Sequence, residues 1–217
     1  MIFLHRQNDP EFINFKDVDG IELDVRSLGD RLVLTHDRIN NKQISIFADG
    51  VLFLEDTIEY LKDYTIIVNV KESGLEEQIS ELFDDNNIKY YFLDSQIPDI
   101  VRLCKQEKFK GKFIIRVSPY EKINNDLLNH SKAEFIWVDW HNFEHFKLDP
   151  YIKFLEDINN NDFINTNKIQ KILVSPELYG FQNINLTHDI IQDKDITEVL
   201  NKYSVCTKIP YEWRKLV

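Results

Sequence analysis

Apolar and polar residues follow one another along the chain in blocks that predict strands and helices in turn. Short apolar runs rich in β-branched residues indicate buried strands, and apolar residues three or four positions apart indicate helices. The predicted strands cover 1–4, 20–25, 65–71, 90–93, 112–117, 134–138, 169–174 and 204–207. The predicted helices cover 52–63, 74–85, 97–106, 120–129, 149–158 and 193–203. A regular order of strand and then helix is typical of a parallel sheet.

The second predicted strand alternates strictly between apolar and acidic side chains. Glu22 and Asp24 share one face of residues 20–25, about 7 Å apart at their Cα atoms and so close enough to share one cation. The turn sequence Leu28-Gly29-Asp30-Arg31 predicts a hairpin with the apolar run that follows it. Pairing about this turn would fold Thr35-His36-Asp37 back beside the two carboxylates, with the imidazole next to them. The alternative interpretation is an amphipathic edge hairpin with a solvated acidic face.

The number of units predicts the fold class, which is α/β with a compact (β/α)₈ TIM barrel and a hairpin after the second strand. About eight strand–helix units suit the lean end of the size range of that barrel. The first helix is expected to be degenerate, because the segment before Asp19 is short and contains Pro10. A doubly wound open sheet is the alternative, but no Gly-rich phosphate motif follows a predicted strand. Nothing divides residues 1–217 into two domains, and the Asn-rich segment 159–167 is expected to be a long surface loop.

Charge and composition narrow the range of partners. The 217 residues include 26 Lys and Arg against 37 Asp and Glu, a net charge of −11 that disfavours nucleic acid and anionic membranes. No apolar run approaches the length of a membrane span, and the four residues before His5 are too short for a signal peptide. Cys104 and Cys206 lack metal-site spacing and are expected to be free thiols of a reducing compartment. We therefore expect a cytoplasmic protein that acts on a small molecule; the composition gives no indication of its oligomeric state.

Nearly all of the predicted strands are apolar until their carboxyl end and then become polar. In a (β/α)₈ barrel these ends surround a single mouth, where active sites lie. Chains also become polar where they return to solvent, but this does not explain why Glu22 shares a face with Asp24, and Asn69 with Lys71. The charged residues at the strand ends are His5, Glu22 and Asp24, Lys71, Asp94, Arg116, Asp139, Glu177 and Lys208.

Three oxygen-bearing side chains would lie together at such a mouth. Glu22, Asp24 and Asn69 offer two carboxylates and an amide oxygen, which are hard ligands suited to Mg²⁺ or Ca²⁺. No cluster of Cys or His in the sequence indicates zinc. The sequence therefore predicts a site for a divalent cation.

Positive charges and imidazoles complete the predicted chemistry. Arg6 and Lys71, with Arg116 further along, would supply fixed positive charge for a phosphate group. His5 and His36 are the candidate acid/base pair, because imidazole titrates near neutral pH. No Gly-x-Ser-x-Gly or Cys/His arrangement indicates a nucleophile. The combination predicts metal-assisted phosphoryl transfer. The other histidines, His130, His141, His145 and His188, are expected to be surface or loop residues.

The motifs of the first 75 residues resemble those of the glycerophosphodiester phosphodiesterase family, a relative of the phosphatidylinositol-specific phospholipase C-like barrels. The resemblance is carried by His5-Arg6, by G-I-E-L-D-V at 20–25 and by T-H-D at 35–37. Later segments resemble a short branch of that family found among bacterial polysaccharide or lipid-related genes. These segments are Y-F-L-D at 91–94, R-V-S-P-Y-E at 116–121 and S-P-E-L-Y-G at 175–180.

The resemblance implies a (β/α)₈ barrel, a divalent cation and hydrolysis of a phosphodiester to a phosphomonoester and an alcohol. It implies that His5 and His36 are the acid/base histidines and that Lys71 binds phosphate. It also implies that Glu22 and Asp24 are two of the metal ligands. The further expected substrate contacts are Asp94, Arg116, Asp139 and Glu177.

Three departures from the family pattern bear on function. Gln7 stands where the family usually has Gly after His-Arg, the usual Glu-Asn-Thr that follows is not legible, and Asn69 replaces the third carboxylate ligand. An amide oxygen can still bind a hard cation, with less charge. Two alternatives to hydrolysis therefore stand: a cyclising phosphodiesterase that uses a substrate hydroxyl, and a catalytically silent barrel that binds a phosphorylated ligand.

Overall fold

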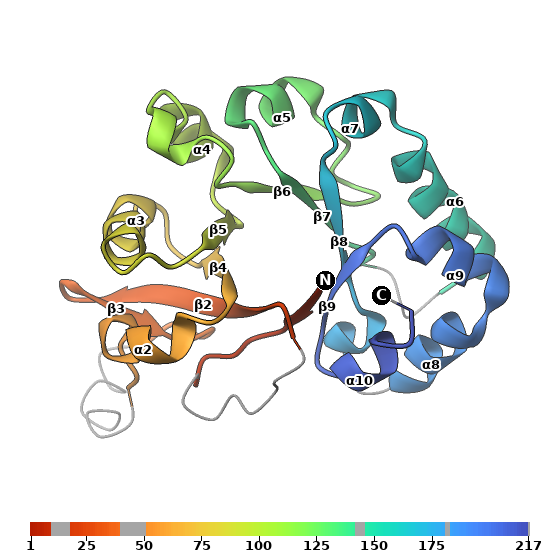
Figure 1. Cartoon of the computed structure of the whole chain (residues 1–217), viewed down its shortest axis with the longest axis horizontal. Coiled ribbons are helices and arrows are strands. Elements are labelled where there is room, and N and C mark those ends of the chain that lie inside the picture. Colours follow the sequence, from red (N-terminus) through yellow and green to blue (C-terminus); the bar gives the residue numbers. More distant parts are fainter. Residues whose placement is uncertain (10–17, 40–50, 142–145, 181–182, 217) are drawn as a thin grey trace.

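The computed structural model confirms the predicted α/β barrel. It describes residues 1–9, 18–39, 51–141, 146–180 and 183–216, so the expected degenerate helix at 10–17 lies outside the described residues. Within them, eight parallel strands form a nearly closed barrel with helices on the outside (Figure 1), in the order β5-β4-β2-β1-β9-β8-β7-β6. They are β1 Ile2–Leu4, β2 Gly20–Leu28, β4 Thr65–Val70, β5 Tyr90–Leu93, β6 Ile114–Val117, β7 Phe135–Val138, β8 Gln170–Val174 and β9 Ser204–Thr207.

The barrel is closed between β5 and β6 by a single bridge. Phe92 pairs with Phe113 just before β6, and the Phe92 N–H donates to the Lys112 carbonyl at 2.7 Å. The other adjacent strands of the barrel pair over two to six residue pairs, from β1 with β2 to β2 with β4, which are in register from Gly20↔Thr65 to Val25↔Val70. The β5–β6 seam is therefore the least bonded part of the wall.

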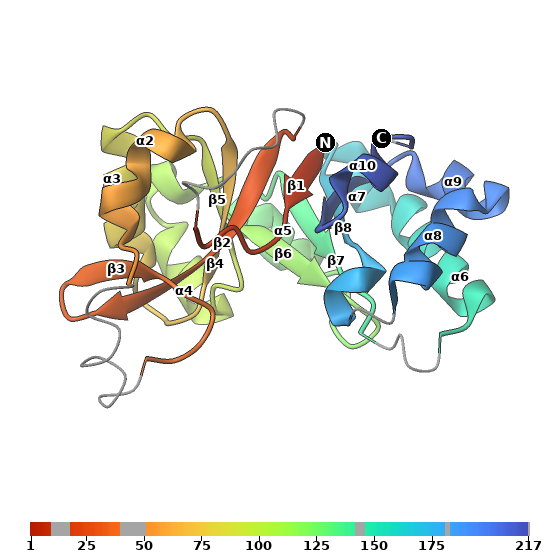
Figure 2. The ribbon, with the colours of Figure 1, turned by 90° about the horizontal axis from the view of Figure 1, so that it is seen from below.

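The helices lie outside the strands in both views (Figures 1 and 2). Within the part of the chain that the structure describes, no helix is long and apolar enough to cross a membrane. The α-helices are α2 Ile58–Leu61, α3 Glu76–Asp85, α4 Ile97–Leu103, α5 Asn125–Ser131, α6 Leu148–Asn159, α7 Asp162–Thr166, α8 Ile184–Gln192, α9 Lys194–Leu200 and α10 Pro210–Trp213. Short 3₁₀ turns are η2 Leu54–Thr57, η3 Glu107–Phe109 and η4 Pro176–Tyr179.

The Asn-rich segment 159–167 is not the long loop that its composition predicts, because it contains α7. The side chain of Asn161 accepts a hydrogen bond from the Ile164 N–H at 3.0 Å and so caps this helix. Ile164 is buried in the core beside it. Asparagine is favoured at helix caps as well as in loops, and composition alone does not separate the two.

The predicted hairpin after the second strand is confirmed. β2 pairs antiparallel with β3 (Arg31–Leu34), in a register that runs from Leu28↔Arg31 to Val25↔Leu34. Gly29 occupies the turn with φ +63°, a conformation that suits glycine. The hairpin extends β2 beyond the other strands of the barrel, as Figure 2 shows.

Alternate residues of the strands fill the barrel interior. Seven strands contribute a compact apolar cluster, consisting of Phe3, Ile67, Tyr91, Leu93, Ile114, Phe135, Trp137, Ile172, Val174 and Cys206. β2 contributes none of these; its inward positions hold Gly20, Glu22 and Asp24. Glu22 and Asp24 therefore lie inside the barrel, next to this apolar cluster. The interpretation of a solvated acidic face is wrong.

Gly20 is required by close packing, and Gly20→Ala should strongly destabilise the fold. A Cβ at this position would lie 2.2 Å from the Thr65 carbonyl oxygen and 2.7 Å from the Phe3 ring. We expect the free energy of unfolding to fall by about 3 kcal/mol or more, measured by urea denaturation. Gly29→Asn is the control, because asparagine tolerates positive φ and a Cβ there meets no neighbour within 4 Å. A Gly20→Ala variant as stable as this control would contradict the packing.

Candidate active site

Two buried carboxylates form the centre of the candidate site. Glu22 and Asp24 are each 1% exposed and lie on the inward face of β2, near the carboxyl end of the barrel. The register of β2 and β4 places Asn69 directly beside Asp24. Lys71 follows β4 and presents its ammonium to the same carboxylate, with Nζ 2.9 Å from Asp24 Oδ1. Four of the predicted site residues are therefore brought together.

The loop after β1 is bonded to both carboxylates. The Arg6 N–H donates to Glu22 Oε2 at 2.7 Å, and the Gln7 N–H donates to the Glu22 carbonyl at 2.7 Å. Asn8 binds Asp24 twice, through its amide to Oδ2 at 2.9 Å and by accepting the Asp24 N–H at 2.7 Å. Arg6 has φ +52°, a strained conformation for a non-glycine residue that these bonds hold in place. Asn8 was not among the predicted residues.

Asp24 is surrounded by positive charge. Besides Lys71, the Arg6 guanidinium lies near it, with Nε 3.4 Å from Oδ2. Of the three cationic residues that the sequence predicts for phosphate binding, Arg6 and Lys71 converge at this carboxylate, whereas Arg116 pairs with Asp94 and Asp139. The Arg6 side chain is 40% exposed, so it can also reach outward to a ligand.

His5 lies against the other carboxylate. Its Nε2 is 3.8 Å from Glu22 Oε2, and its Nδ1 is buried without a hydrogen-bond partner within the described part of the chain. Burial, together with the positive charges of Arg6 and Lys208, lowers the pKa of His5 to about 4. His5 is therefore a neutral imidazole at neutral pH, beside the buried acids as predicted.

His36 is placed at the rim and not against the buried acids. Its Nδ1 lies 2.9 Å from Asp37 Oδ1, and its side chain is 43% exposed. The Arg26 guanidinium holds the His36 carbonyl with two bonds of 3.1 Å. The backbone of Thr35, rather than the imidazole, contacts Asp24, with the Thr35 N–H donating to the Asp24 carbonyl at 3.0 Å. The predicted position of Thr35 beside Asp24 is therefore confirmed, whereas the His36 imidazole pairs with Asp37 and, among the described residues, makes no ion pair with either buried acid.

The donor set fits a hard divalent cation. Asn69 Oδ1 is buried and lacks a hydrogen-bond partner among the described residues, although the Asn69 side chain is hydrogen-bonded to Glu22. Burial and the adjacent negative charge of Asp24 raise the pKa of Glu22 to about 7. A bound cation would supply countercharge to Glu22 and a partner for the unused Asn69 oxygen, with Asp24, already paired with Lys71 and Arg6, as the third oxygen ligand. Within the described chain no group of three His, Cys, Asp or Glu residues is arranged for a metal, so the amide of Asn69 would be needed.

A second polar cluster lies at the ends of β5, β6 and β7. The Arg116 guanidinium binds Asp94 through Nε at 3.1 Å and binds Asp139 through Nη1. Asp94 has φ +63°, so its backbone is also strained at the rim. Burial raises the pKa of Asp139, although Arg116 opposes this rise. Three of the four residues predicted as substrate contacts are therefore together, and two carboxylates already neutralise Arg116.

His141 belongs to this cluster and was missed by the sequence analysis. Its Nδ1 lies 3.6 Å from Asp139 Oδ1, and its Nε2 lies 3.8 Å from Glu121 Oε2. Tyr120 stacks on its ring at 6.1 Å. The signal was available, since His141 follows the strand-end residue Asp139 by two positions, the spacing that keeps side chains on one face.

Glu177 has a role inside the fold instead. Its Oε1 accepts from Thr207 Oγ1 at 2.6 Å and from the Lys208 N–H at 3.0 Å. Its Oε2 accepts from Ser175 Oγ and from Thr187 Oγ1 at 3.2 Å. The buried carboxylate thus joins the end of β8, through Ser175, to β9 and α8, and this geometry gives no support to the predicted substrate contact.

Glu177→Gln should therefore destabilise the protein without a direct effect on the site. A glutamine amide would place its NH₂ group where one carboxylate oxygen now accepts hydrogen bonds, so that it would face groups that donate. We expect a loss of about 2–4 kcal/mol in the free energy of unfolding, measured in urea. Glu198→Gln, an exposed change on α9, is the matched control and should change stability by less than about 0.5 kcal/mol. Equal stability of both variants would refute the structural role.

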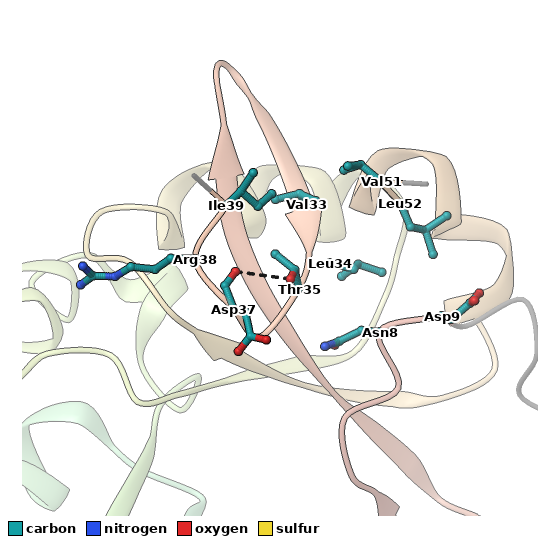
Figure 3. Close-up of a pocket in the computed structure, with 10 residues that line it drawn as sticks. All are labelled: Asn8, Asp9, Val33, Leu34, Thr35, Asp37, Arg38, Ile39, Val51 and Leu52. Carbon is teal, nitrogen blue, oxygen red and sulfur yellow. Dashed lines mark hydrogen bonds between the residues drawn. The ribbon is translucent and has the colours of Figure 1, made fainter. Parts of the chain in front are cut away.

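A pocket of about 350 Å³ adjoins the first cluster through Asn8. In Figure 3 the side chains of Asn8 and Asp37 point toward one another, whereas Arg38 extends away from them. The pocket therefore lies between the loop after β1 and the end of the β2–β3 hairpin. Its described lining is Asn8, Asp9, Val33, Leu34, Thr35, Asp37, Arg38, Ile39, Val51 and Leu52.

Comparison with solved structures places the chain in a known fold. The crystal structure named "Putative glycerophosphoryl diester phosphodiesterase from Silicibacter pomeroyi DSS-3" superposes with a TM-score of 0.63 over 99% of this chain and 92% of that chain. The two sequences are 8% identical, so the likeness concerns the fold. The neighbour bears the name of the family that the motifs at 5–6, 20–25 and 35–37 resemble. No protein-family model and no curated protein matches the sequence.

Proposed function

We propose that this protein is a divalent-cation-dependent phosphodiesterase that hydrolyses a glycerophosphodiester-type substrate to a phosphomonoester and an alcohol. The observation that carries the proposal is the buried Glu22–Asp24 pair, with the unpartnered Asn69 oxygen beside it and Lys71 and Arg6 alongside. A site that joins hard oxygen ligands to fixed cations suits a phosphate group bound through a metal. The fold shared with the named neighbour supports the same reading.

The residues would divide the reaction as follows. Glu22, Asp24 and Asn69 would hold Mg²⁺ or Ca²⁺, which when bound polarises the phosphate oxygens. Lys71 and Arg6 would bind the negatively charged phosphate, and their ion pairs with Asp24 would weaken as they do so.

His5 and His36 would carry the protons. His5 accepts a proton from the attacking water as the new P–O bond forms, because its ring lies beside the buried site. His36, on the rim with Asp37, donates a proton to the alcohol oxygen as the old P–O bond breaks. The rim cluster of Asp94, Arg116 and Asp139 would contact the alcohol, since the charge of Arg116 is already balanced.

An assay with matched substrates tests the proposal. The purified chain is incubated with a bis-aryl phosphodiester and with several glycerophosphodiesters, in Mg²⁺, in Ca²⁺ and in a chelator. We expect turnover with a cation and its loss with the chelator. Lys71→Ala should raise KM for every diester, whereas the exposed Lys62→Ala should not. A cyclic phosphate that persists by ³¹P NMR would assign the cyclising reaction instead, and binding without turnover would assign a silent binding barrel.

A further inference from the structure

A second pocket lies at the end of the barrel opposite the candidate active site. It has a volume of about 430 Å³ and is lined at the amino-terminal ends of two strands, by Gln170 of β8 and Ser204 of β9. The candidate site residues instead follow the carboxyl ends of their strands. The two places are therefore separated by the length of the barrel and can be tested independently.

The charge lining this pocket is one-sided. Three lysines, Lys168, Lys171 and Lys202, contribute to its wall, and none of its described lining residues is acidic. The chain as a whole carries a net charge of −11, so an acid-free group of three lysines departs from its average. Gln170, Asn201 and Ser204 add amide and hydroxyl donors to the same wall.

Lys171 is the most unusual of the three. It is only 8% exposed, and its Nζ donates to an amide oxygen, Asn159 Oδ1, at 3.0 Å. Within the described residues no carboxylate lies within ion-pair distance of it. Burial, together with the nearby charge of Lys202, lowers the pKa of Lys171. Besides this amide, the centroid of the Tyr203 ring lies 5.4 Å from Nζ, so both described partners are uncharged, and a buried ammonium without a countercharge is costly unless an anion joins it.

Helix ends account for part of this arrangement. Lys168 and Lys202 follow the carboxyl ends of α7 and α9, where the helix dipole favours cations. This explains why each stands where it does in the sequence. It does not explain why both line one pocket with a buried lysine and without an acidic lining residue, while the acids near Lys202 (Glu156, Asp195 and Glu198) line the neighbouring pocket instead.

We propose that this pocket binds a small oxyanion of the phosphate class, with Lys171, Lys168 and Lys202 as its charged contacts. A tetrahedral oxyanion presents several oxygens to donors that come from different elements, as the lysines and the Ser204 hydroxyl do here. This site is separate from the proposed phosphodiesterase site and does not depend on it.

The probe is inorganic phosphate, added to the full chain in the presence of a chelator. Lys71→Ala serves as the background, so that phosphate bound near Asp24 does not contribute. At saturating phosphate, with ionic strength held constant by NaCl, we expect the melting temperature to rise on the order of 3 °C. Calorimetric titration should show affinity at least about tenfold weaker in Lys171→Met, whereas the exposed Lys153→Met on α6 should bind as the background does.

Further variants and other anions also test whether the pocket binds phosphate. Lys202→Met, an exposed change with little risk to folding, should also weaken phosphate binding, which guards against a folding defect in Lys171→Met. Sulfate should stabilise in the same way. The proposal is overturned if phosphate has no effect, if Lys171→Met and Lys202→Met retain full affinity, or if acetate and chloride stabilise equally at the same ionic strength.

Discussion

Replacement of His5 by alanine should lower kcat for glycerophosphodiester hydrolysis by about two to four orders of magnitude. His5 is the imidazole that lies against the buried acids, 3.8 Å from Glu22, and its Nδ1 has no protein partner among the described residues. If His5 is the proton acceptor that we propose, its removal slows chemistry rather than binding, so KM should change little. Steady-state kinetics with saturating cation measures both values.

His130→Ala is the matched control for His5→Ala, because His130 is exposed on α5 and bonds only to a backbone carbonyl in the described chain. His36→Ala supplies a sharper comparison. If His36 protonates the leaving alcohol, its loss should slow alkyl diesters strongly and spare nitrophenyl diesters, whose leaving group departs without a proton. Full turnover by His5→Ala, or equal losses of His36→Ala on both substrates, would show that these roles are wrongly assigned.

Glu22→Gln should raise the cation concentration that gives half-maximal activity by at least about tenfold, since it would remove one of the two charged ligands that we propose for the cation. Asn69→Asp should shift this concentration in the opposite direction. Without cation, Glu22→Gln should be more stable than the unaltered chain and Asn69→Asp should be less stable. Glu22→Gln relieves repulsion between two buried acids, whereas Asn69→Asp adds a third.

Urea denaturation with and without Mg²⁺ or Ca²⁺ measures this effect independently of turnover. The stability of Asn69→Asp should recover when cation is added, by about 1.4 kcal/mol for each tenfold excess of cation over Kd. Glu198→Gln is again the neutral control. If all of these variants respond to cation as the unaltered chain does, Glu22 and Asn69 are not its ligands.

The barrel could be predicted from the sequence because its strands are bounded by local signals. The predicted strand 90–93 coincides with β5, and 204–207 coincides with β9, since each is a short apolar run ended by a polar residue. The alternation at 20–25 also showed that Glu22 and Asp24 share one face of β2. It did not show that this face is buried, because both faces of residues 20–25 are buried in the barrel.

Other parts of the site depend on contacts that no local pattern contains. Asn8 lies in a loop, and only the return of that loop onto β2 brings it to Asp24. Glu177 follows its strand as the other acids do, yet the hydroxyls around it come from Ser175 just after β8, from β9 and from α8. Strand-end position shows that a charged residue reaches the mouth, but it does not show whether the fold or a ligand uses the charge.

Because a single bridge joins β5 to β6, the Asp94–Arg116 ion pair also helps to hold the barrel closed. Those two side chains come from opposite sides of the least bonded seam, so they fasten two strands that the backbone scarcely joins. Amide hydrogens of β6 that face this seam should consequently exchange with solvent sooner than those shared by β2 and β4. A ligand that draws either side chain away from the other also loosens the wall there, so that occupancy of the mouth and closure of the cylinder become linked.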